Sequence, residues 1–157
     1  MTPARGRRGG AARGPRPPAL AVTDRGRPRM ALAFLRRVVR AALAHGGAPR
    51  MPVSLLLCDD REISAIHARH LGLRAPTDVI SFAIDGTAEL VVSTETARRC
   101  AQQRARAVDA EVALYVVHGL LHLCGYDDRD ARARARMRAA ERAVLATLGI
   151  DVDDVDA

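Results

Sequence analysis

Lysine is absent from this chain of 157 residues, so all 25 of its basic Lys/Arg positions are arginines. The planar guanidinium group binds phosphate oxygens in pairs, which suits nucleic-acid recognition. A GC-rich genome would produce the same bias, and we favour that cause. The net charge of +7 is therefore compatible with an RNA partner but does not demonstrate one.

The positive charge is concentrated at the N-terminus. Residues 1–30 hold eight arginines against one acid, Asp24, which accounts for the whole excess of seven. From residue 31 onward, arginines and acidic residues balance at 17 each, and four of these acids lie in the final "DVDDVDA". The body of the chain therefore has only a modest basic excess.

Tryptophan is also absent, and the aromatic residues are limited to two tyrosines and two phenylalanines. Stacking of bases on aromatic rings therefore cannot dominate any RNA binding. Tyr126 is the best stacking candidate, although a packing role for it is favoured.

No run of about 20 apolar residues is present, so we expect a soluble protein without a membrane span. The N-terminus lacks the apolar segment of a secretory signal. The three cysteines, Cys58, Cys100 and Cys124, fall in predicted core segments, which favours reduced thiols in a cytoplasmic protein.

Composition divides the chain into three parts. Residues 1–18 form an Arg/Gly/Pro-rich extension that we expect to be disordered. This extension either contacts nucleic acid or reflects a start site assigned too far upstream. Residues 19–151 form one domain, and residues 152–157 form an acidic tail.

The spacing of apolar residues predicts an α+β (mixed α/β) domain. We expect a small mixed four-stranded sheet packed against about five helices. "DG" at 85–86 predicts a tight hairpin, and Ser93 or Thr94 caps the helix that follows. The predicted strands cover 19–26, 51–58, 75–84 and 88–93, and the predicted helices cover 30–47, 59–72, 93–107, 109–125 and 130–149.

The stretch "HGLLHLCGYDD" at 118–128 predicts a metal site on the central helix. His118 and His122 are four residues apart, so both imidazoles lie on one helical face. Gly125 tolerates the left-handed turn at which the helix ends. The returning chain then presents Asp127 or Asp128 as a third ligand, and three protein ligands suit a catalytic zinc.

Two other histidine patterns carry less information. His67 and His70 are three residues apart without a third ligand, and we interpret them as surface or core residues. Zinc proteases carry a glutamate directly after the first histidine of H-E-x-x-H, and Gly119 stands at that position here. Peptide hydrolysis by that mechanism is therefore disfavoured.

Two motifs of this sequence resemble those of a known family. "HGLLHLCGYDD" is similar to the H-G-x-L-H-L-x-G-Y-D-H signature of the YbeY family of endoribonucleases and rRNA maturation factors. "PTDVISF" at 76–82 resembles that family's P-T-D-V-L-S-F block. The strand "ELVVS" and the helix "MRAAERAVLATLG" are similar to later family segments, so the resemblance covers about residues 19–151.

The resemblance implies a zinc-dependent, single-strand-specific endoribonuclease. Such proteins act in maturation of the small-subunit rRNA 3′ end and in ribosome quality control. Their three histidine ligands correspond to His118, His122 and Asp128, which would hold one Zn²⁺ per chain. Aspartate binds zinc at a bond length similar to that of histidine, but its charge makes a bound water less acidic. Iron or nickel also suits this ligand set.

The family's substrate-binding arginine is not in its usual place. It lies five residues before P-T-D, where this chain has Leu71. Arg74 or Arg69 could supply the charge that neutralises phosphate in the transition state. Ser81 and Thr77 could line the RNA groove, or they could be ordinary strand residues. The family's Gly-Asp before the next strand is replaced by Ala88-Glu89.

Two other functions stay open. One is a metal hydrolase acting on a different substrate. The other is a non-catalytic, metal-containing ribosome-assembly factor, which the change of the third ligand favours. The resemblance suggests single-stranded RNA or rRNA, the small ribosomal subunit and its assembly factors as partners. The sequence is compatible with two reactions at the RNA phosphate. Attack by a metal-bound hydroxide leaves 5′-phosphate ends, and attack by the RNA 2′-hydroxyl leaves a 2′,3′-cyclic phosphate.

Overall fold

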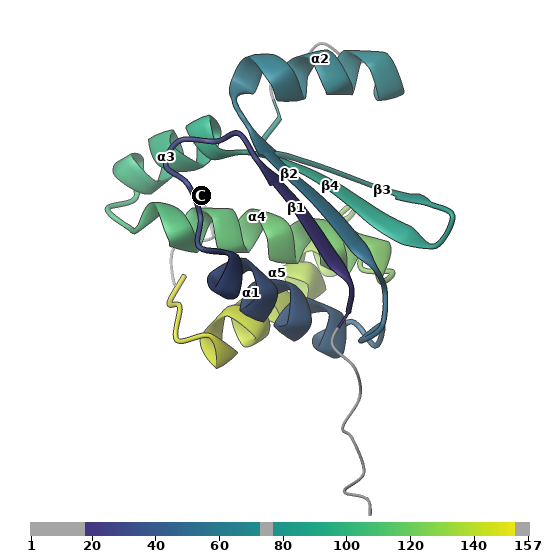
Figure 1. Cartoon of the computed structure of the whole chain (residues 1–157). Helices are drawn as coiled ribbons and strands as arrows, with labels where there is room; N and C mark the ends of the chain where they lie inside the picture. Colours follow the sequence, from purple (N-terminus) through teal and green to yellow (C-terminus); the bar gives the residue numbers. More distant parts are fainter. Residues whose placement is uncertain (1–17, 73–76, 153–157) are drawn as a thin grey trace, which may run out of the picture.

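A computed structural model describes residues 18–72 and 77–152 of the chain. Within these ranges the chain forms four strands and five helices in one mixed α+β fold (Figure 1), which confirms the predicted fold class. In chain order the elements are β1 (Leu20–Asp24), α1 (Leu32–His45), β2 (Val53–Cys58), α2 (Asp60–Leu71), β3 (Val79–Ile84), β4 (Thr87–Ser93), α3 (Thr94–Gln103), α4 (Val108–Leu123) and α5 (Ala131–Thr147).

The sheet has the strand order β1-β2-β4-β3. β1, β2 and β4 run parallel, and β3 pairs antiparallel with β4 at one edge. β3 and β4 are joined by the predicted hairpin, in which Asp85 and Gly86 both have positive φ angles of 49° and 78°. Two positive φ values are typical of the type I′ turn that matches the twist of paired strands.

The two faces of the sheet bury different sets of side chains. Because side chains alternate along a strand, Leu55 and Leu90 face the main core, whereas Cys58 and Val91 face a smaller one. The main core is covered by α1, α3, α4 and α5, and α2 lies on the opposite face (Figure 1).

Helix α4 lies at the centre of the main core. It contacts β3 and β4 on one side and α1, α3 and α5 on the others, and its residues from Glu111 to Val117 are all buried. None of the helices in the described ranges is long and apolar enough to cross a membrane.

Several helix boundaries follow from local signals in the sequence. Ser93 caps α3 by accepting a hydrogen bond from the Thr96 amide at 3.0 Å, and Asp59 caps α2 by accepting one from the Glu62 amide at 2.8 Å. Gly72 ends α2 in the left-handed conformation, with φ of 67°.

The observed boundaries differ from the sequence-based prediction most clearly at three places. The strand predicted from residue 75 begins at Val79, and residues 77–78 lie outside the ladder. The helix predicted to residue 107 ends at Gln103, because Ala105 turns the chain with φ of 51°. Val152, assigned to the acidic tail, is buried against the core. The tail from 153 onward and the N-terminal extension up to residue 17 lie outside the described residues.

Candidate metal centre

The two histidines lie on the last turns of α4. Both side chains are half-buried, each with 29% of its surface exposed, and their rings meet edge to face with centroids 4.6 Å apart. Gly125 follows the helix with φ of 103°, a conformation that glycine adopts without strain. The chain reverses there and brings Asp128 back over the same helical face.

The structure brings one ligand atom from each of His118, His122 and Asp128 within 4.8 Å of the others. The Oδ2 atom of Asp128 lies 3.3 Å from Nε2 of His122 and 3.9 Å from Nε2 of His118. The neighbouring acid, Asp127, instead accepts a hydrogen bond from the Asp128 amide and faces Arg129 at 3.6 Å.

The other ring nitrogen of each histidine has its own partner. Nδ1 of His118 lies 2.5 Å from a carboxylate oxygen of Glu141 on α5, and Nδ1 of His122 lies 3.0 Å from the carbonyl oxygen of Tyr126. When Nδ1 donates a hydrogen bond, the lone pair remains on Nε2, which is the atom that faces Asp128. The tautomer of both rings is thus set for ligation through Nε2.

These residues fit a divalent metal. Zinc bonds to nitrogen and oxygen of about 2.0–2.2 Å in a tetrahedron place neighbouring ligand atoms roughly 3.4 Å apart. The separations from Asp128 to His122 and His118, 3.3 and 3.9 Å, are close to that value, and all three ligand atoms lie within 4.8 Å of one another. The cluster could therefore hold a metal ion.

The acids around His118 alter its proton affinity. Burial of the ring acts to lower the pKa of His118, but the hydrogen bond and charge of Glu141 outweigh burial, with smaller contributions from Asp78 and Asp128. The net effect raises the pKa above its ordinary value. The same negative charges favour a bound cation at Nε2.

A cleft of about 250 Å³ opens beside the cluster. His118 and Asp128 form part of its wall, and α5 contributes Arg134, Met137 and Arg138. Because this cleft adjoins the candidate metal centre, we infer that it is the substrate-binding cleft.

Among the described residues, the other candidates do not line this cleft. Arg69 is exposed on α2, which covers the opposite face of the sheet, and Ser81 is half-buried in β3. The Thr77 hydroxyl donates to the carbonyl of Val79 at 3.2 Å. Tyr126 packs beside His45 with ring centroids 6.2 Å apart. Arg74 lies outside the described residues.

The remaining histidine pair does not join the cluster. His67 is buried, and the His70 ring stacks on Phe82 with centroids 5.4 Å apart.

Sequence reasoning missed Glu141 and the α5 arginines. Glu141 lies four residues after Met137 and three before Val144, so it falls on the apolar face of α5. An acid within an apolar stripe requires a buried partner, and this signal could have identified it. Nothing in the local sequence indicates that its partner is His118.

Comparison with known proteins identifies the family. The family profile described as "Endoribonuclease YbeY" matches residues 26–149. The chain is 36% identical to Endoribonuclease YbeY of Moorella thermoacetica over 136 residues, which covers 76% of this chain and 87% of that protein. This chain therefore belongs to the YbeY family.

Other relatives agree with this assignment. Endoribonuclease YbeY of Heliobacterium modesticaldum is 36% identical over 116 residues, covering 62% of this chain and 70% of the relative. That of Anaeromyxobacter sp. is 42% identical over 123 residues, covering 72% and 64%. The solution structure of TM1509 from Thermotoga maritima is similar in fold, with a TM-score of 0.59 at 19% identity over 88% of this chain and 99% of that one.

Proposed function

We propose that this protein is a metal-dependent endoribonuclease that cleaves single-stranded RNA in rRNA maturation, at the 3′ end of small-subunit RNA and in ribosome quality control. His118, His122 and Asp128 hold one Zn²⁺. Membership of the YbeY family supports the reaction class. The substrate, the metal and a cytoplasmic location form part of the same proposal, as do the small ribosomal subunit and its assembly factors as partners.

One observation carries the metal assignment. The three ligand atoms converge within 4.8 Å, and each histidine is held through Nδ1, by Glu141 and by the Tyr126 carbonyl. Convergence on Nε2 with both rings oriented is the arrangement that metal-binding histidines adopt.

The chemistry of the site follows from charge and geometry. When bound, a zinc ion supplies Lewis acidity toward a phosphate oxygen or a water. Glu141 fixes the orientation of His118, and Asp128 closes the cluster from the chain that follows α4. Gly119 leaves no carboxylate beside His118 on the helix, which separates this site from H-E-x-x-H proteases.

A second function is favoured by one feature. Asp128 stands where the family signature has histidine, and its negative charge weakens activation of a bound water. Retention of the metal without RNA cleavage would make the protein a non-catalytic ribosome-assembly factor.

The test combines elemental analysis of the purified protein with cleavage of a single-stranded RNA oligonucleotide. The variants are Asp128→Ala, Asp128→His and, as a matched control on the adjacent acid, Asp127→Ala. We expect near-stoichiometric zinc and metal-dependent cleavage in the wild type and in Asp127→Ala, with both reduced in Asp128→Ala. Asp128→His should retain the metal and cleave faster than the wild type.

Each failure has a separate meaning. Wild-type protein without metal after growth in zinc would exclude the ligand assignment. Protein that holds zinc but leaves RNA intact would favour the assembly factor. If Asp127→Ala loses the metal and Asp128→Ala keeps it, Asp127 is the third ligand.

A further inference from the structure

Two arginines of α5 face the cleft beside the candidate metal centre. Arg134 and Arg138 are four residues apart, so they lie on one helical face, and both line the same cleft as His118 and Asp128. A guanidinium of Arg134 also donates to the Asp128 carbonyl at 3.2 Å, which places it at the edge of the cluster. Arg138 lies one helical turn farther away, a rise of about 5.4–6 Å.

The charges of the cleft are unevenly distributed. Asp128 and Glu141 belong to the metal end, where a divalent ion would balance both carboxylates. The described residues that line the rest of the cleft include one acid, Asp78, and three arginines, Arg104, Arg134 and Arg138.

The positive charge of Arg104 is only partly balanced by its acidic partner. Arg104 lies 3.3 Å from the fully buried Glu111, which Arg106 also approaches at 3.1 Å. Two cations around one carboxylate leave a net positive charge behind the cleft. With metal bound, the part of the cleft away from the cluster thus favours an anion.

The cleft also has an apolar surface. Leu114 of α4 and Met137 of α5, both buried, contribute to its walls together with Val79. A basic rim next to an apolar wall matches a nucleotide, which combines a charged phosphate with a flat base. The volume of about 250 Å³ lies near the small end of ligand pockets, and suits one nucleotide of a single strand.

We propose that Arg134 and Arg138 hold the RNA backbone phosphate adjacent to the one that is cleaved, with its nucleoside against Leu114 and Met137. This inference rests on the proposed function and assigns the substrate phosphate to α5. It requires no arginine from α2 or from the segment before β3.

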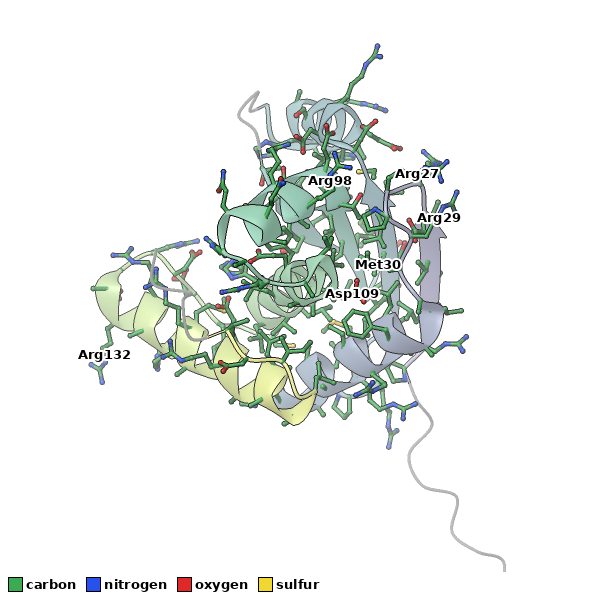
Figure 2. The ribbon with its side chains drawn as sticks, turned by 90° about the vertical axis from the view of Figure 1, so that its left-hand side faces the viewer. Arg27, Arg29, Met30, Arg98, Asp109 and Arg132 are labelled. Carbon is green, nitrogen blue, oxygen red and sulfur yellow. The ribbon has the colours of Figure 1, made fainter. Side chains whose placement is uncertain are left out.

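The first arm of the test measures RNA binding without cleavage. Affinity for a 2′-O-methyl single-stranded RNA oligonucleotide, checked by electrophoresis to remain intact, is measured with zinc-loaded protein by fluorescence anisotropy between about 50 and 200 mM salt. Elemental analysis checks that all variants carry the same amount of zinc. The variants are Arg134→Ala, Arg138→Ala and the double variant. The control is Arg132→Ala, an arginine of the same helix whose side chain points away from the rest of the chain (Figure 2).

The double variant should reduce the slope of log affinity against log salt by about 0.7, the value for one phosphate contact to a single strand. Arg132→Ala should retain the wild-type slope. An unchanged slope in the double variant overturns the proposal. Arg138→Ala is the single variant that keeps the hydrogen bond from Arg134 to the Asp128 carbonyl. If Arg138→Ala unfolds, Arg138→Gln replaces it and retains most of the aliphatic stem.

The second arm uses cleavage by zinc-loaded protein. A neutral methylphosphonate is placed on either side of the cleaved linkage. In wild type, one of the two positions should lower kcat/KM by roughly 10- to 100-fold, the effect of losing a charge-assisted hydrogen bond. The double variant should be slow on unmodified RNA and insensitive to that substitution. Equal sensitivity in both proteins contradicts the inference.

The two arms separate this inference from the proposed function. If wild type binds RNA but does not cleave it, the nuclease proposal fails. The salt dependence of RNA affinity in the double variant then still tests whether Arg134 and Arg138 bind a phosphate. If wild type cleaves RNA and the double variant behaves as Arg132→Ala does, the function stands and the α5 assignment is wrong. Absence of RNA binding by wild type overturns both.

Discussion

A carboxylate oxygen of Glu141 lies 2.5 Å from Nδ1 of His118, across 23 residues of sequence and between two helices. The Glu141 side chain is almost fully buried, with 4% of its surface exposed. A buried carboxylate is costly unless it is paired, so this contact ties α5 to α4 beside the cluster. It also fixes which nitrogen of His118 faces Asp128.

The first prediction concerns this contact. Glu141→Gln preserves the shape of the side chain but removes its charge, so the His118 ring becomes a weaker ligand. We expect the dissociation constant for zinc to rise about tenfold or more, within the range for residues that support a metal ligand. Competition with a chromophoric chelator measures it. Glu89→Gln serves as the control, because Glu89 lies on β4 toward the α2 face. Equal zinc affinity in Glu141→Gln and wild type would remove Glu141 from the site.

The second prediction concerns Asp60 at the start of α2. Burial acts to raise the pKa of this carboxyl, but hydrogen bonds from Ser93, Thr96 and Arg99 outweigh it, and the pKa is lowered below its ordinary value. A lowered pKa in the folded state means that the ionised carboxylate stabilises the fold above its unfolded pKa, about 3.9. That stabilisation is lost as the pH falls through the lower folded pKa.

Wild type should therefore lose more stability than Asp60→Asn between pH 7 and pH 3, and Asp60→Asn should be the less stable of the two at pH 7. Urea unfolding at both pH values measures the difference. Asp109→Asn, an exposed acid of the first turn of α4, serves as the control. Parallel pH dependence in wild type and Asp60→Asn would contradict the assignment.

The third prediction concerns Gly119, between the two histidines. A Cβ atom there would lie 3.2 Å from side-chain carbons of both Leu90 and Val79, so this position faces the sheet and not the cluster. Gly119→Glu should place an unpaired carboxylate in the core and destabilise the protein by about 3 kcal/mol or more. It should not generate peptidase activity, because its carboxylate points away from His122.

Gly119→Ala distinguishes crowding from charge. Alanine gains about 1 kcal/mol in helix propensity, while Leu90 and Val79 must move by a few tenths of an ångström. We expect the alanine variant to remain folded and the glutamate variant to unfold at a much lower urea concentration. Similar midpoints for the two variants would mean that the position is less confined than the structure shows.

The local elements were predictable because each depends on neighbouring residues. Asp85-Gly86 predicted a hairpin and Gly125 a turn with positive φ, and both are confirmed. The predicted cap, Ser93 or Thr94, is Ser93. The four-residue spacing of His118 and His122 placed both rings on one face before any tertiary contact was known. Ala105 had no such signal, because alanine rarely adopts the positive φ that ends α3 there.

The long-range parts of the site were not predictable in the same way. The contact from Glu141 to His118 and that from Arg134 to the Asp128 carbonyl depend on how α5 packs on α4. Sequence periodicity identifies the buried face of α5 but not its partner or its position along that partner. The family resemblance pointed instead to arginines near residues 69–74, and Arg69 lies on α2, across the sheet from the cluster.

The last prediction concerns Cys58 and the opening of α2. Within the described residues α2 covers its face of the sheet as a single helix (Figure 1), and the core beneath it is small, with Ile63, Ile80 and Val91 around Cys58. Few buried apolar contacts favour local opening at a lower free energy than global unfolding. The thiol of Cys58 is fully buried, and burial, with the charges of Glu62 and Asp59, raises its pKa to about 12.

Because the thiolate is the reactive form, Cys58 should resist alkylation in the native protein at pH 8. In a Cys100→Ala/Cys124→Ala background, labelling by iodoacetamide should become measurable at urea concentrations below the global unfolding midpoint, as α2 detaches. Ile63→Ala should accelerate this labelling much more than Val116→Ala, which perturbs the main core instead. If Cys58 is labelled only in step with loss of total helical signal, α2 unfolds together with the main core, and the smaller core is not an independent unit.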